Sequence, residues 1–333
     1  MKQDDMIKES SAEIIAESPK TVSKQMEVFY NPVMKLNRSL SVCVINAYFG
    51  KPARIADPMA GTGIRAIRLL KEAEGKIESI DINDYSEKSV ELIKKNLELN
   101  KINNKFTIHN KDANLFLLES TGFDYIDIDP FGTPNPFLDS AIKRIARDGI
   151  LAVTATDTAA LTGTYEHACE RKYWAKPLRN YLMHEIGLRI LIRKIQLIGA
   201  QYEKALVPVL SYSKDHYYRI FFRCEKGKKK CDIIVKQHKF FQEKYGPIWT
   251  GKLEDSALIQ KMLNYADPES AKLLEILRDE LDVVGFKELN NQKMEDAIKK
   301  LKSKGIESSR THFAGNGIKC DCDSATLFKI IKS

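Results

Sequence analysis

The chain has 333 residues, which is long for one hydrophobic core, so we expect two domains. Hydrophobic residues make up 43% of it and charged residues 29%, a composition typical of a globular protein, and no apolar run is long enough to cross a bilayer. The formal net charge of +8 permits a polyanionic partner but does not identify one.

The N-terminal segment, residues 1–18, is polar and acidic. Signal peptides carry an apolar core and transit peptides are basic, so this segment matches neither. We therefore expect a cytoplasmic protein without membrane association, and we infer no obligate protein partner.

Residues 51–160 alternate short apolar segments with amphipathic ones. The expected strands are residues 54–57, 76–82, 106–108, 123–128 and 150–155, and the expected helices are residues 64–74, 86–100 and 137–147. Alternation at this spacing predicts βαβ units and a mostly parallel sheet, which is an α/β fold.

The pattern changes after residue 200. The expected elements are an antiparallel pair (205–211 with 217–224) that closes an edge of the sheet, helices over 271–281 and 294–303, and short strands over 318–322 and 327–331. The glycine and lysines of residues 227–230 are the best candidate for a linker. We therefore predict a first domain over residues 1–226 and a smaller α+β domain over residues 227–333.

A turn rich in small residues joins the first strand of this sheet to the first helix. It spans residues 57–65 and contains Gly61 and Gly63, which allow the backbone to approach a ligand closely. The spacing lacks the third glycine of the dinucleotide-binding fingerprint. Taken alone, the turn is equally consistent with a tight connection that binds nothing.

Acidic residues follow the first three strands of the predicted sheet. Asp57 ends the first strand, Asp81 ends the second, and Asp112 with Ala113 follows the third. The carboxyl ends of parallel strands meet at one edge, and an acid after the second strand can accept both hydroxyls of a ribose. No lysine follows the glycines to bind a phosphate, so the site favours an uncharged or cationic adenosine, which S-adenosylmethionine supplies.

A proline-containing turn follows the fourth strand, with the sequence Asp129-Pro130-Phe131-Gly132. It resembles the Asp/Asn-Pro-Pro-aromatic motif of methyltransferases that act on the amines of nucleobases and of glutamine. An amine conjugated to a ring is a weak nucleophile, and a carboxylate such as Asp129 can accept its proton. Pro130 fixes the turn, and Phe131 can stack on a base. The alternative is an ordinary Asp-Pro turn, and Asp127 before it is also consistent with a structural acid.

Access to a base requires an unstacked or flipped nucleotide, and residues 171–194 fit an RNA-facing surface. Basic residues in this segment are interleaved with aromatic ones, and phosphate contacts from them would position a substrate without reading its sequence. The residues expected to contact RNA are Arg171, Lys172, Lys176 and Arg179, and the segment continues with Arg189, Arg193 and Lys194. The alternative is a solvated helix face.

The six cysteines do not form a metal-binding pattern. Structural zinc sites usually use two pairs of ligands at a separation of two to four residues. Cys224 and Cys231 are too far apart for such a pair, and Cys320 and Cys322 are too close. We therefore predict free thiols and no bound metal.

Motifs along the whole chain resemble the tRNA guanine-26 N2-dimethyltransferase family of archaea and eukaryotes. The turn at Asp129 is similar to the catalytic loop of that family, and residues 29–32 with Asn37 and Arg38 are similar to its N-terminal motif. Further matches lie at residues 154–159, 171–173, 246–251, 309–313 and 317–319. Ser39 and Trp174 depart from the pattern of the family.

The resemblance implies a class I S-adenosylmethionine-dependent methyltransferase domain with a Rossmann-like, seven-stranded sheet, and a smaller α+β domain that contacts tRNA. It implies methylation of the N2 amine of guanine 26 in tRNA, which gives N2-methylguanosine and N2,N2-dimethylguanosine. It also implies Asp129 as the base and Phe131 as the stacking partner of the guanine, with Phe29 opposite. The residues expected around the cofactor are Arg38, Asp57, Gly61, Gly63, Arg65, Asp81, Ile82, Asp112 and Ala113.

Two other functions stay open on the sequence. The first is an amino methyltransferase that acts on the N6 of adenine or on a protein glutamine. The second is a non-catalytic RNA-binding protein on a methyltransferase fold, against which the set of Asp57, Asp81, Asp112 and Asp129 argues.

Overall fold

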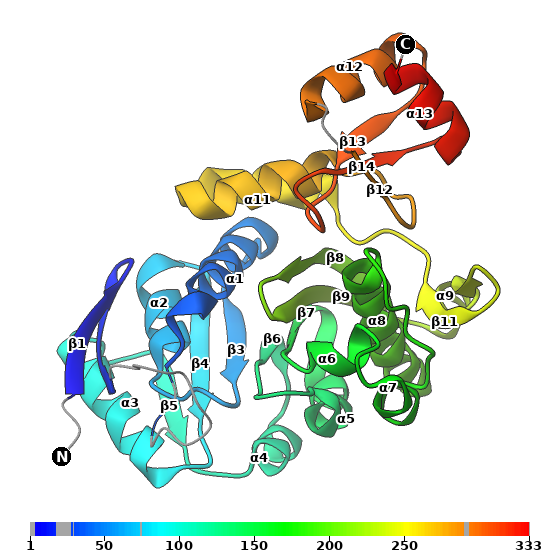
Figure 1. Cartoon of the computed structure of the whole chain (residues 1–333). Coiled ribbons are helices and arrows are strands. Elements are labelled where there is room, and N and C mark those ends of the chain that lie inside the picture. Colours follow the sequence, from blue (N-terminus) through cyan, green and yellow to red (C-terminus); the bar gives the residue numbers. More distant parts are fainter. Residues whose placement is uncertain (1–3, 18–27, 29, 74, 290–292, 333) are drawn as a thin grey trace.

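The computed structural model describes residues 4–17, 28, 30–73, 75–289 and 293–332. A seven-stranded sheet with the order β5-β4-β3-β6-β7-β9-β8 forms its centre (Figure 1). Its strands are β3 (Ala53–Asp57), β4 (Ile77–Asn83), β5 (Phe106–His109), β6 (Phe123–Ile128), β7 (Ile145–Ala155), β8 (Lys204–Lys214) and β9 (Tyr217–Lys226). Neighbouring strands are parallel except at β9, which is antiparallel to both β7 and β8.

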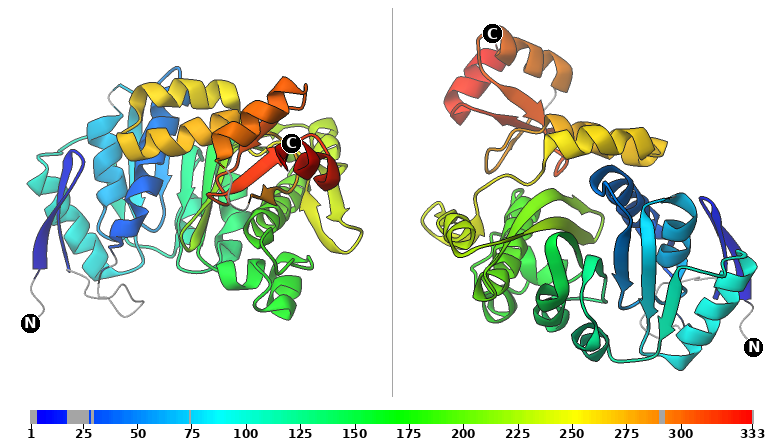
Figure 2. Two further views of the ribbon diagram at one scale, coloured as in Figure 1. Left: turned by 45° about the horizontal axis from the view of Figure 1, so that its top comes forward. Right: turned by 180° about the vertical axis from the view of Figure 1, so that it is seen from behind.

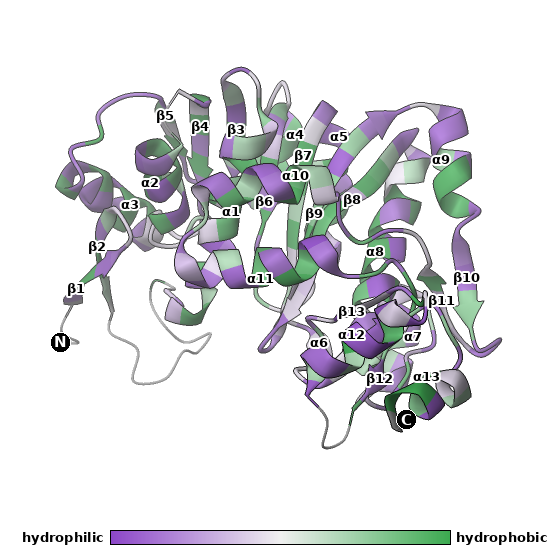
Figure 3. Cartoon of the chain, turned by 90° about the horizontal axis from the view of Figure 1, so that it is seen from above, coloured by the Kyte–Doolittle hydropathy of each residue, from purple (hydrophilic) through white to green (hydrophobic). Residues whose placement is uncertain are grey.

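Helices cover both faces of the sheet. Successive side chains along a strand point to opposite faces, and both faces carry apolar side chains that the helices bury. Ile55 of β3 packs under the helices of one face, and its neighbour Ala56 packs under those of the other. The first face carries α1 (Lys35–Tyr48), α2 (Ile64–Glu72) and α3 (Glu87–Leu99), and the second carries α4 (Ala113–Glu119), α5 (Asn135–Arg144) and α8 (Met183–Gln201). In Figure 3 the middle of the sheet is mostly green, while purple residues gather on the helices. The structure confirms the α/β fold class.

Local features start three helices at the carboxyl edge of the sheet. Ser86 and Asp112 accept hydrogen bonds from backbone N–H groups in the first turns of α3 and α4. Helix α2 instead begins at Gly63, whose φ of +77° suits glycine and whose Cβ, if it had one, would lie 3.2 Å from Ile93. The sequence therefore specifies where the chain turns back from each strand.

A hairpin that the sequence did not predict precedes the sheet. Its strands are β1 (Asp4–Glu9) and β2 (Ala12–Glu17). The side chain of Asn96 on α3 accepts a hydrogen bond from Ile15 N at 2.7 Å and donates one to Ile15 O at 3.2 Å. This amide holds the hairpin against the sheet domain.

The chain before the C-terminal unit contains further elements outside the central sheet. They are α6 (Thr158–Leu161), α7 (Glu166–Tyr173), α9 (Lys228–Val235), β10 (His238–Phe241), β11 (Tyr245–Trp249), α10 (Ser256–Met262) and α11 (Pro268–Asp279), with 3-10 turns at Pro32–Met34 and Leu263–Tyr265. Helix α9 and strand β11 pack on α8, and α10 and α11 pack on α1. None of the described helices is long and apolar enough to cross a membrane.

The C-terminal unit has a core of its own and lies at the opposite end of the molecule from the N-terminal hairpin (Figure 2). Its elements are β12 (Lys287–Glu288), α12 (Met294–Ser303), β13 (Ser308–Arg310), β14 (Gly317–Cys320) and α13 (Ser324–Lys332). Strand β14 is central and pairs antiparallel with β12 and β13. This agrees with the α+β character expected of the C-terminal part.

The candidate linker at residues 227–230 is wrong. Helix α9 begins at Lys228, and it packs Cys231 and Ile234 into the core of the sheet domain. The lysines therefore belong to a helix turn whose apolar side is buried. The proposed division of the chain at residue 226 stays a prediction.

Two further boundaries differ from expectation. Residues 327–331 belong to helix α13 rather than to a strand, because Asp323 accepts a hydrogen bond from Thr326 N at 2.9 Å and so starts a helix. The helix expected over residues 137–147 ends at Arg144, and β7 begins at the next residue, Ile145.

Candidate active site

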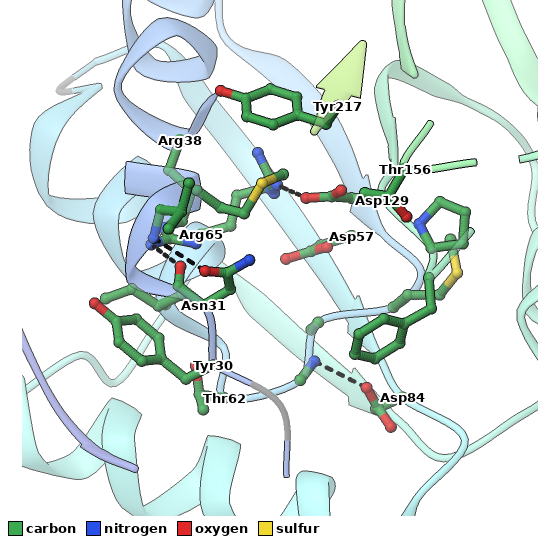
Figure 4. A pocket seen from close by; sticks show the side chains of 18 of the residues that line it. Tyr30, Asn31, Arg38, Asp57, Thr62, Arg65, Asp84, Asp129, Thr156 and Tyr217 are labelled. Atoms are coloured by element: carbon green, nitrogen blue, oxygen red, sulfur yellow. Dashed lines mark hydrogen bonds and ion pairs between the residues drawn. The ribbon is translucent and has the colours of Figure 1, made fainter. Parts of the chain in front are cut away.

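A cavity of about 790 Å³ opens at the carboxyl edge of the sheet (Figure 4). Its lining comes from the ends of β3, β4, β6 and β7, from the start of α1, and from the turn between β8 and β9. The residues predicted from the sequence that line it are Arg38, Asp57, Gly61, Arg65, Asp129, Pro130 and Phe131. The glycine turn and the proline-containing turn therefore face one space.

The end of β4 holds the glycine turn in place. Asp84 lines the cavity and accepts a hydrogen bond from Gly61 N at 2.8 Å. The fully buried Asn83 donates to the carbonyl oxygens of Pro58 at 2.9 Å and of Lys111 at 3.0 Å. These bonds join the turns that follow β3, β4 and β5. The acid that the second strand brings to the cavity is therefore Asp84.

Asp81 and Ile82 do not line the cavity, which corrects their expected positions. Strand β4 continues to Asn83, so both residues lie within the strand and point to opposite faces. Asp81 lies 2.7 Å from Nε2 of His109, in a separate depression beside α4. Ile82 packs in the core on the face of α2. The expected strand ended at Ile82, one residue before the observed end, and Asp84 was therefore not among the expected site residues.

Asp57 lies near the centre of Figure 4, between Asp84 and Asp129. Its side chain is buried, and its Oδ2 makes no hydrogen bond. Burial raises the pKa of this carboxyl to about 7, against the opposing charge of Arg65. A buried carboxyl oxygen without a partner is unfavourable, so Asp57 can gain a donor or a cation from a ligand in the cavity.

Asp129 begins the turn after β6, and its side chain is 20% exposed. Arg65 forms an ion pair with its carboxylate. Three residues further along, the N–H of Gly132 donates to Thr156 Oγ1 at 2.7 Å, and Gly132 O accepts from Thr156 N at 2.9 Å. The turn that carries Phe131 is thus tied to the loop after β7, and Gly132 adopts a φ of +79° there.

A buried ion cluster lies beneath Asp129. Arg219 of β9 donates two hydrogen bonds to Asp127, at 2.8 and 2.7 Å, and Arg65 lies 3.2 Å from the same carboxylate. Burial acts to raise the pKa of Asp127, but Arg219 and Arg65 outweigh it and lower the pKa to about 2. Asp127 is therefore a structural acid. We call Arg65, Asp127 and Arg219 the floor cluster.

Arg38 reaches the cavity from the first turns of α1, and Glu9 of the N-terminal hairpin holds it there. Glu9 accepts hydrogen bonds from Arg38 Nε at 2.7 Å, from Arg68 at 3.0 Å and from the hydroxyl of Tyr30 at 3.1 Å. Burial acts to raise the pKa of Glu9, but the two arginines keep it below its ordinary value. Glu9 was not among the expected site residues, because its position depends on a hairpin that was not predicted.

Three more of the predicted residues, Gly63, Asp112 and Ala113, do not line the cavity. Gly63 starts α2 behind the turn. Asp112 caps α4 and Ala113 is buried in its first turn, and neither lines the cavity. Their contact with an adenine stays a prediction. Phe29 lies outside the described residues.

The four residues expected to contact RNA lie in and after α7. Arg171, Lys172 and Arg179 are exposed, and Lys176 is partly exposed. Lys172 forms an ion pair with Asp157 at 2.8 Å, and Lys176 forms one with Glu166 at 3.2 Å. Their position at the surface permits phosphate contacts, which stay a prediction.

Two basic residues of the same segment are not at the surface, which corrects its extent. Arg189 is fully buried and forms an ion pair with Glu185 at 2.9 Å. Lys194 is buried too, with its ammonium group over the ring of Trp174. A phosphate cannot reach either side chain, because α8 packs this side on the core.

The turn between β8 and β9 completes the cavity wall. It contributes Asp215, His216 and Tyr217. The sequence indicated the two strands but not the place of their turn, which depends on β9 pairing with β7 rather than lying at the sheet edge.

The cysteines of the described structure are all free. Cys224 and Cys231 are buried, and the sulfur atoms of Cys320 and Cys322 lie 3.3 Å apart. Among the described residues, no three His, Cys, Asp or Glu side chains are grouped to hold a metal ion.

Comparison with known proteins agrees with this site. The family model for N2,N2-dimethylguanosine tRNA methyltransferases matches residues 9–244 and 236–332. A tRNA (guanine(26)-N(2)/guanine(27)-N(2))-dimethyltransferase of Aquifex aeolicus is 37% identical, with 98% of this chain and 95% of the relative covered. A tRNA (guanine(26)-N(2))-dimethyltransferase of Methanocaldococcus jannaschii is 36% identical, with 96% of both covered.

A solved structure shows the same fold over the whole chain. It is that of Trm1 from Pyrococcus horikoshii in complex with S-adenosyl-L-methionine, which is similar with a TM-score of 0.89 at 34% identity and covers 98% of this chain and 99% of that one. The family model and both relatives extend through the C-terminal unit as well as the sheet domain. The chain therefore belongs to the N2,N2-dimethylguanosine tRNA methyltransferase family.

Proposed function

We propose that the chain is an S-adenosylmethionine-dependent enzyme that methylates the N2 amine of guanine 26 in tRNA, first to N2-methylguanosine and then to N2,N2-dimethylguanosine. The observation that carries this proposal is the single cavity that joins the glycine turn to the turn at Asp129, in a chain of this family. Adenine N6 and protein glutamine are weaker candidates as acceptors, because the family match extends over the C-terminal unit too.

One half of the cavity fits S-adenosylmethionine. Gly61 lets the backbone approach the ligand, and the carboxylate of Asp84 suits the ribose hydroxyls. The unpartnered Oδ2 of Asp57 suits the ammonium group of the methionine moiety, and Arg38 suits its carboxylate. When bound there, the cofactor supplies an electrophilic methyl group on a sulfonium.

The other half of the cavity fits an aromatic amine. The carboxylate of Asp129 accepts an N–H of the amine and takes its proton as the nitrogen forms its new bond. Arg65 holds this carboxylate in the wall, and Thr156 holds the turn that follows it. Phe131 stacks on the guanine, which contributes about 1–3 kcal/mol per base. Phe29 opposite Phe131 belongs to the same proposal.

A guanine within folded tRNA can enter such a cavity only after it leaves its stack. Arg171, Lys172, Lys176 and Arg179 would hold the neighbouring phosphates, and Asp112 with Ala113 would contact the adenine of the cofactor. The hydroxyl of Tyr173 at the end of α7 donates to Thr133 Oγ1 at 3.0 Å. This bond supports the proposal because it connects the basic segment with the catalytic turn. We also propose that the enzyme acts in the cytoplasm and needs no protein partner.

The test is incubation of the purified chain with a tRNA transcript and S-adenosylmethionine that carries a labelled methyl group. Nucleoside mass spectrometry should show N2-methylguanosine first and N2,N2-dimethylguanosine later. A transcript with adenosine at position 26 is the matched control and should stay unlabelled.

Other outcomes of the same experiment separate the alternatives. Labelled N6-methyladenosine, or label in protein, would contradict the acceptor. If calorimetry detected no binding of S-adenosylmethionine, the chain would be an RNA-binding protein without catalysis.

A further inference from the structure

Three C-terminal motifs lie away from the cavity and meet around helix α8. They are residues 246–251, 309–313 and 317–319, and none of them lines the cavity. Helix α8 belongs to the sheet domain, whereas the last two motifs belong to the C-terminal unit. The motifs therefore meet at the junction between the two parts of the molecule.

Lys319 of β14 makes the central contact of this junction. Its Nζ lies 3.3 Å from Oε1 of Glu185 on α8 and 3.0 Å from Oε1 of Glu280, and all three side chains are almost completely buried. A buried charge without a partner is strongly unfavourable, so each of these groups depends on the others. One lysine thus connects the C-terminal unit with α8 and with the chain that follows α11.

Glu280 fastens the motif at residues 309–313. It accepts hydrogen bonds from Thr311 Oγ1 at 2.7 Å and from His312 N at 3.0 Å, and it lies 2.7 Å from Nδ1 of His312. Burial acts to raise the pKa of Glu280, but His312 and Lys319 hold it well below its ordinary value. Glu280 is therefore ionised and can pair with Lys319.

Arg189 fastens the motif at residues 246–251 on the other side of Glu185. Its Nε donates to Glu185 at 2.9 Å, and its Nη1 donates to the carbonyl oxygens of Trp249 at 3.1 Å and Gly251 at 3.0 Å. Two motifs are therefore bound directly to one turn of α8, and the motif at residues 309–313 is connected to it through Glu280 and Lys319. We call Glu185, Arg189, Glu280 and Lys319 the junction clamp.

Close packing surrounds the clamp. The ring of Phe286 stacks on Phe313 with an interplanar angle of 2°, and it meets Tyr181 edge-on at a centroid distance of 5.7 Å. Gly317 has no space for a side chain, since a Cβ there would lie 2.5 Å from Thr311. A close-packed, charge-paired contact of this kind has one arrangement and does not allow gradual sliding.

We propose that the junction clamp sets the spacing between the C-terminal unit and Asp129, and thereby selects which nucleotide of the tRNA enters the cavity. The inference rests on the proposed function. The C-terminal unit presents exposed lysines at Lys299, Lys302 and Lys304, which can hold phosphates. Phosphate contacts fix the register of a nucleic acid without reading its sequence.

When a tRNA is bound at the C-terminal unit and at the cavity, the fixed distance between these two sites determines which nucleotide reaches Asp129. The clamp residues touch neither the acceptor nor the cofactor in this scheme. Glu185 and Lys319 are positioning residues, which act through the place of the C-terminal unit.

The experiment compares two clamp variants with a surface control. Lys319→Met removes the charge at similar length, and Glu185→Gln keeps the shape of the side chain. Lys299→Met makes the same change as the first variant on the exposed side of the same unit. Mass spectrometry of nuclease fragments locates the methyl groups, steady-state kinetics give KM for tRNA, and calorimetry gives Kd for S-adenosylmethionine.

In both clamp variants, kcat/KM for position 26 should fall by up to about a hundredfold, because a misplacement on the order of 1 Å has that effect. Methyl groups should appear at neighbouring guanines, and Kd for S-adenosylmethionine should not change. Lys299→Met should raise KM for tRNA and leave the methylated position unchanged.

Folded clamp variants that keep both the methylated position and KM would overturn the inference. Failure of both variants to fold, judged by circular dichroism and thermal unfolding, would also overturn it, since the clamp would then serve folding rather than spacing. If the unaltered chain methylates no tRNA at all, the proposed function fails instead, and the two failures are distinguishable.

Discussion

The protein buries ionic side chains in two places, and the two clusters end differently. The floor cluster leads from Arg219 through Asp127 and Arg65 to Asp129, which is partly exposed in the cavity wall. The junction clamp runs from Arg189 through Glu185 and Lys319 to Glu280, and none of these four residues lines the cavity. Under the proposed function, the first cluster orients a reacting group, whereas the second connects two parts of the chain.

The degree of exposure separates the two roles. Both oxygens of Asp127 are occupied by Arg219, and its side chain is 0% exposed, whereas that of Asp129 is 20% exposed. A carboxylate that must take a proton from an acceptor needs such access, and the groups behind it need none.

The largest expected effect is on Asp129, the exposed end of the floor cluster. Asp129→Ala should lower kcat by about 10²–10⁴-fold, the usual contribution of a general base, while Kd for S-adenosylmethionine stays within error. Single-turnover methylation of tRNA and calorimetry measure the two quantities. Asp129→Asn, which keeps the shape, should lose as much activity. An equal loss of cofactor binding would show that Asp129 is structural like Asp127.

Removal of the buried arginine of the floor cluster should lower the free energy of unfolding by an amount similar to the increase in activation free energy expected for Asp129→Ala. Arg219→Met leaves Asp127 buried without its main partner and should lower the free energy of unfolding by about 3–5 kcal/mol. Urea unfolding measures this change. Arg223→Met on the same strand is the matched control, because Arg223 is about one-third exposed in its pair with Glu225 and should contribute less than about 1 kcal/mol. Equal effects would remove the distinction between buried and exposed pairs.

Asp57 should make cofactor binding depend on pH near neutrality. Its pKa is raised from 3.8 to about 7, so the folded state holds a proton that the unfolded state has lost, and stability falls as pH rises between these values. A cationic ligand favours the ionised carboxylate. Below pH 7, Kd for S-adenosylmethionine should therefore fall by up to about tenfold for each unit by which the pH rises, and above pH 7 it should level off. Calorimetry in buffers of different ionisation enthalpy should detect proton release on binding. Asp57→Asn should bind with a flat pH profile, and a retained profile would assign the proton elsewhere.

The smallest effect should come from the basic surface residues in and after α7. Alanine at Arg171, Lys176 and Arg179 should raise KM for tRNA several-fold and lower the slope of log K against log salt by roughly one unit for each phosphate that is no longer bound. Filter binding across a salt series measures the slope. Lys143→Ala, an exposed lysine of α5, is the control and should leave the slope unchanged. An unchanged slope in the triple variant would remove these residues from the RNA surface.

Local patterns in the sequence predicted the sheet and much of the site. The short apolar segments of β3 and β6, the small residues around Gly61 and the proline turn at Asp129 depend on near neighbours in the chain, and the structure has these elements where they were expected. Asp84 was not predicted because β4 ends at Asn83, one residue beyond its expected end at Ile82. A shift of one residue along a strand turns a side chain to the other face.

Long-range pairs could not be predicted in the same way. Asp127 and Arg219 are 92 residues apart, and Glu185 and Lys319 are 134 residues apart. Neither residue of such a pair has a local signal that names its partner, because the pairing follows from sheet order and from the docking of the C-terminal unit. The basic residues Arg189 and Lys194 were placed at the surface for this reason.

Because β9 runs antiparallel to β7, two parts of the cavity wall that lie close in space come from distant positions in the sequence. Because β9 runs against β7, it brings its beginning to the carboxyl edge, and the tip at Asp215 and His216 faces the space shared with the glycine turn. A surface turn tolerates substitution and insertion more readily than a strand end. Mutation can therefore reshape the wall at this tip while leaving Asp57, Gly61 and Asp84 intact. In evolutionary terms, the choice of acceptor can diverge while the use of the cofactor is inherited unchanged.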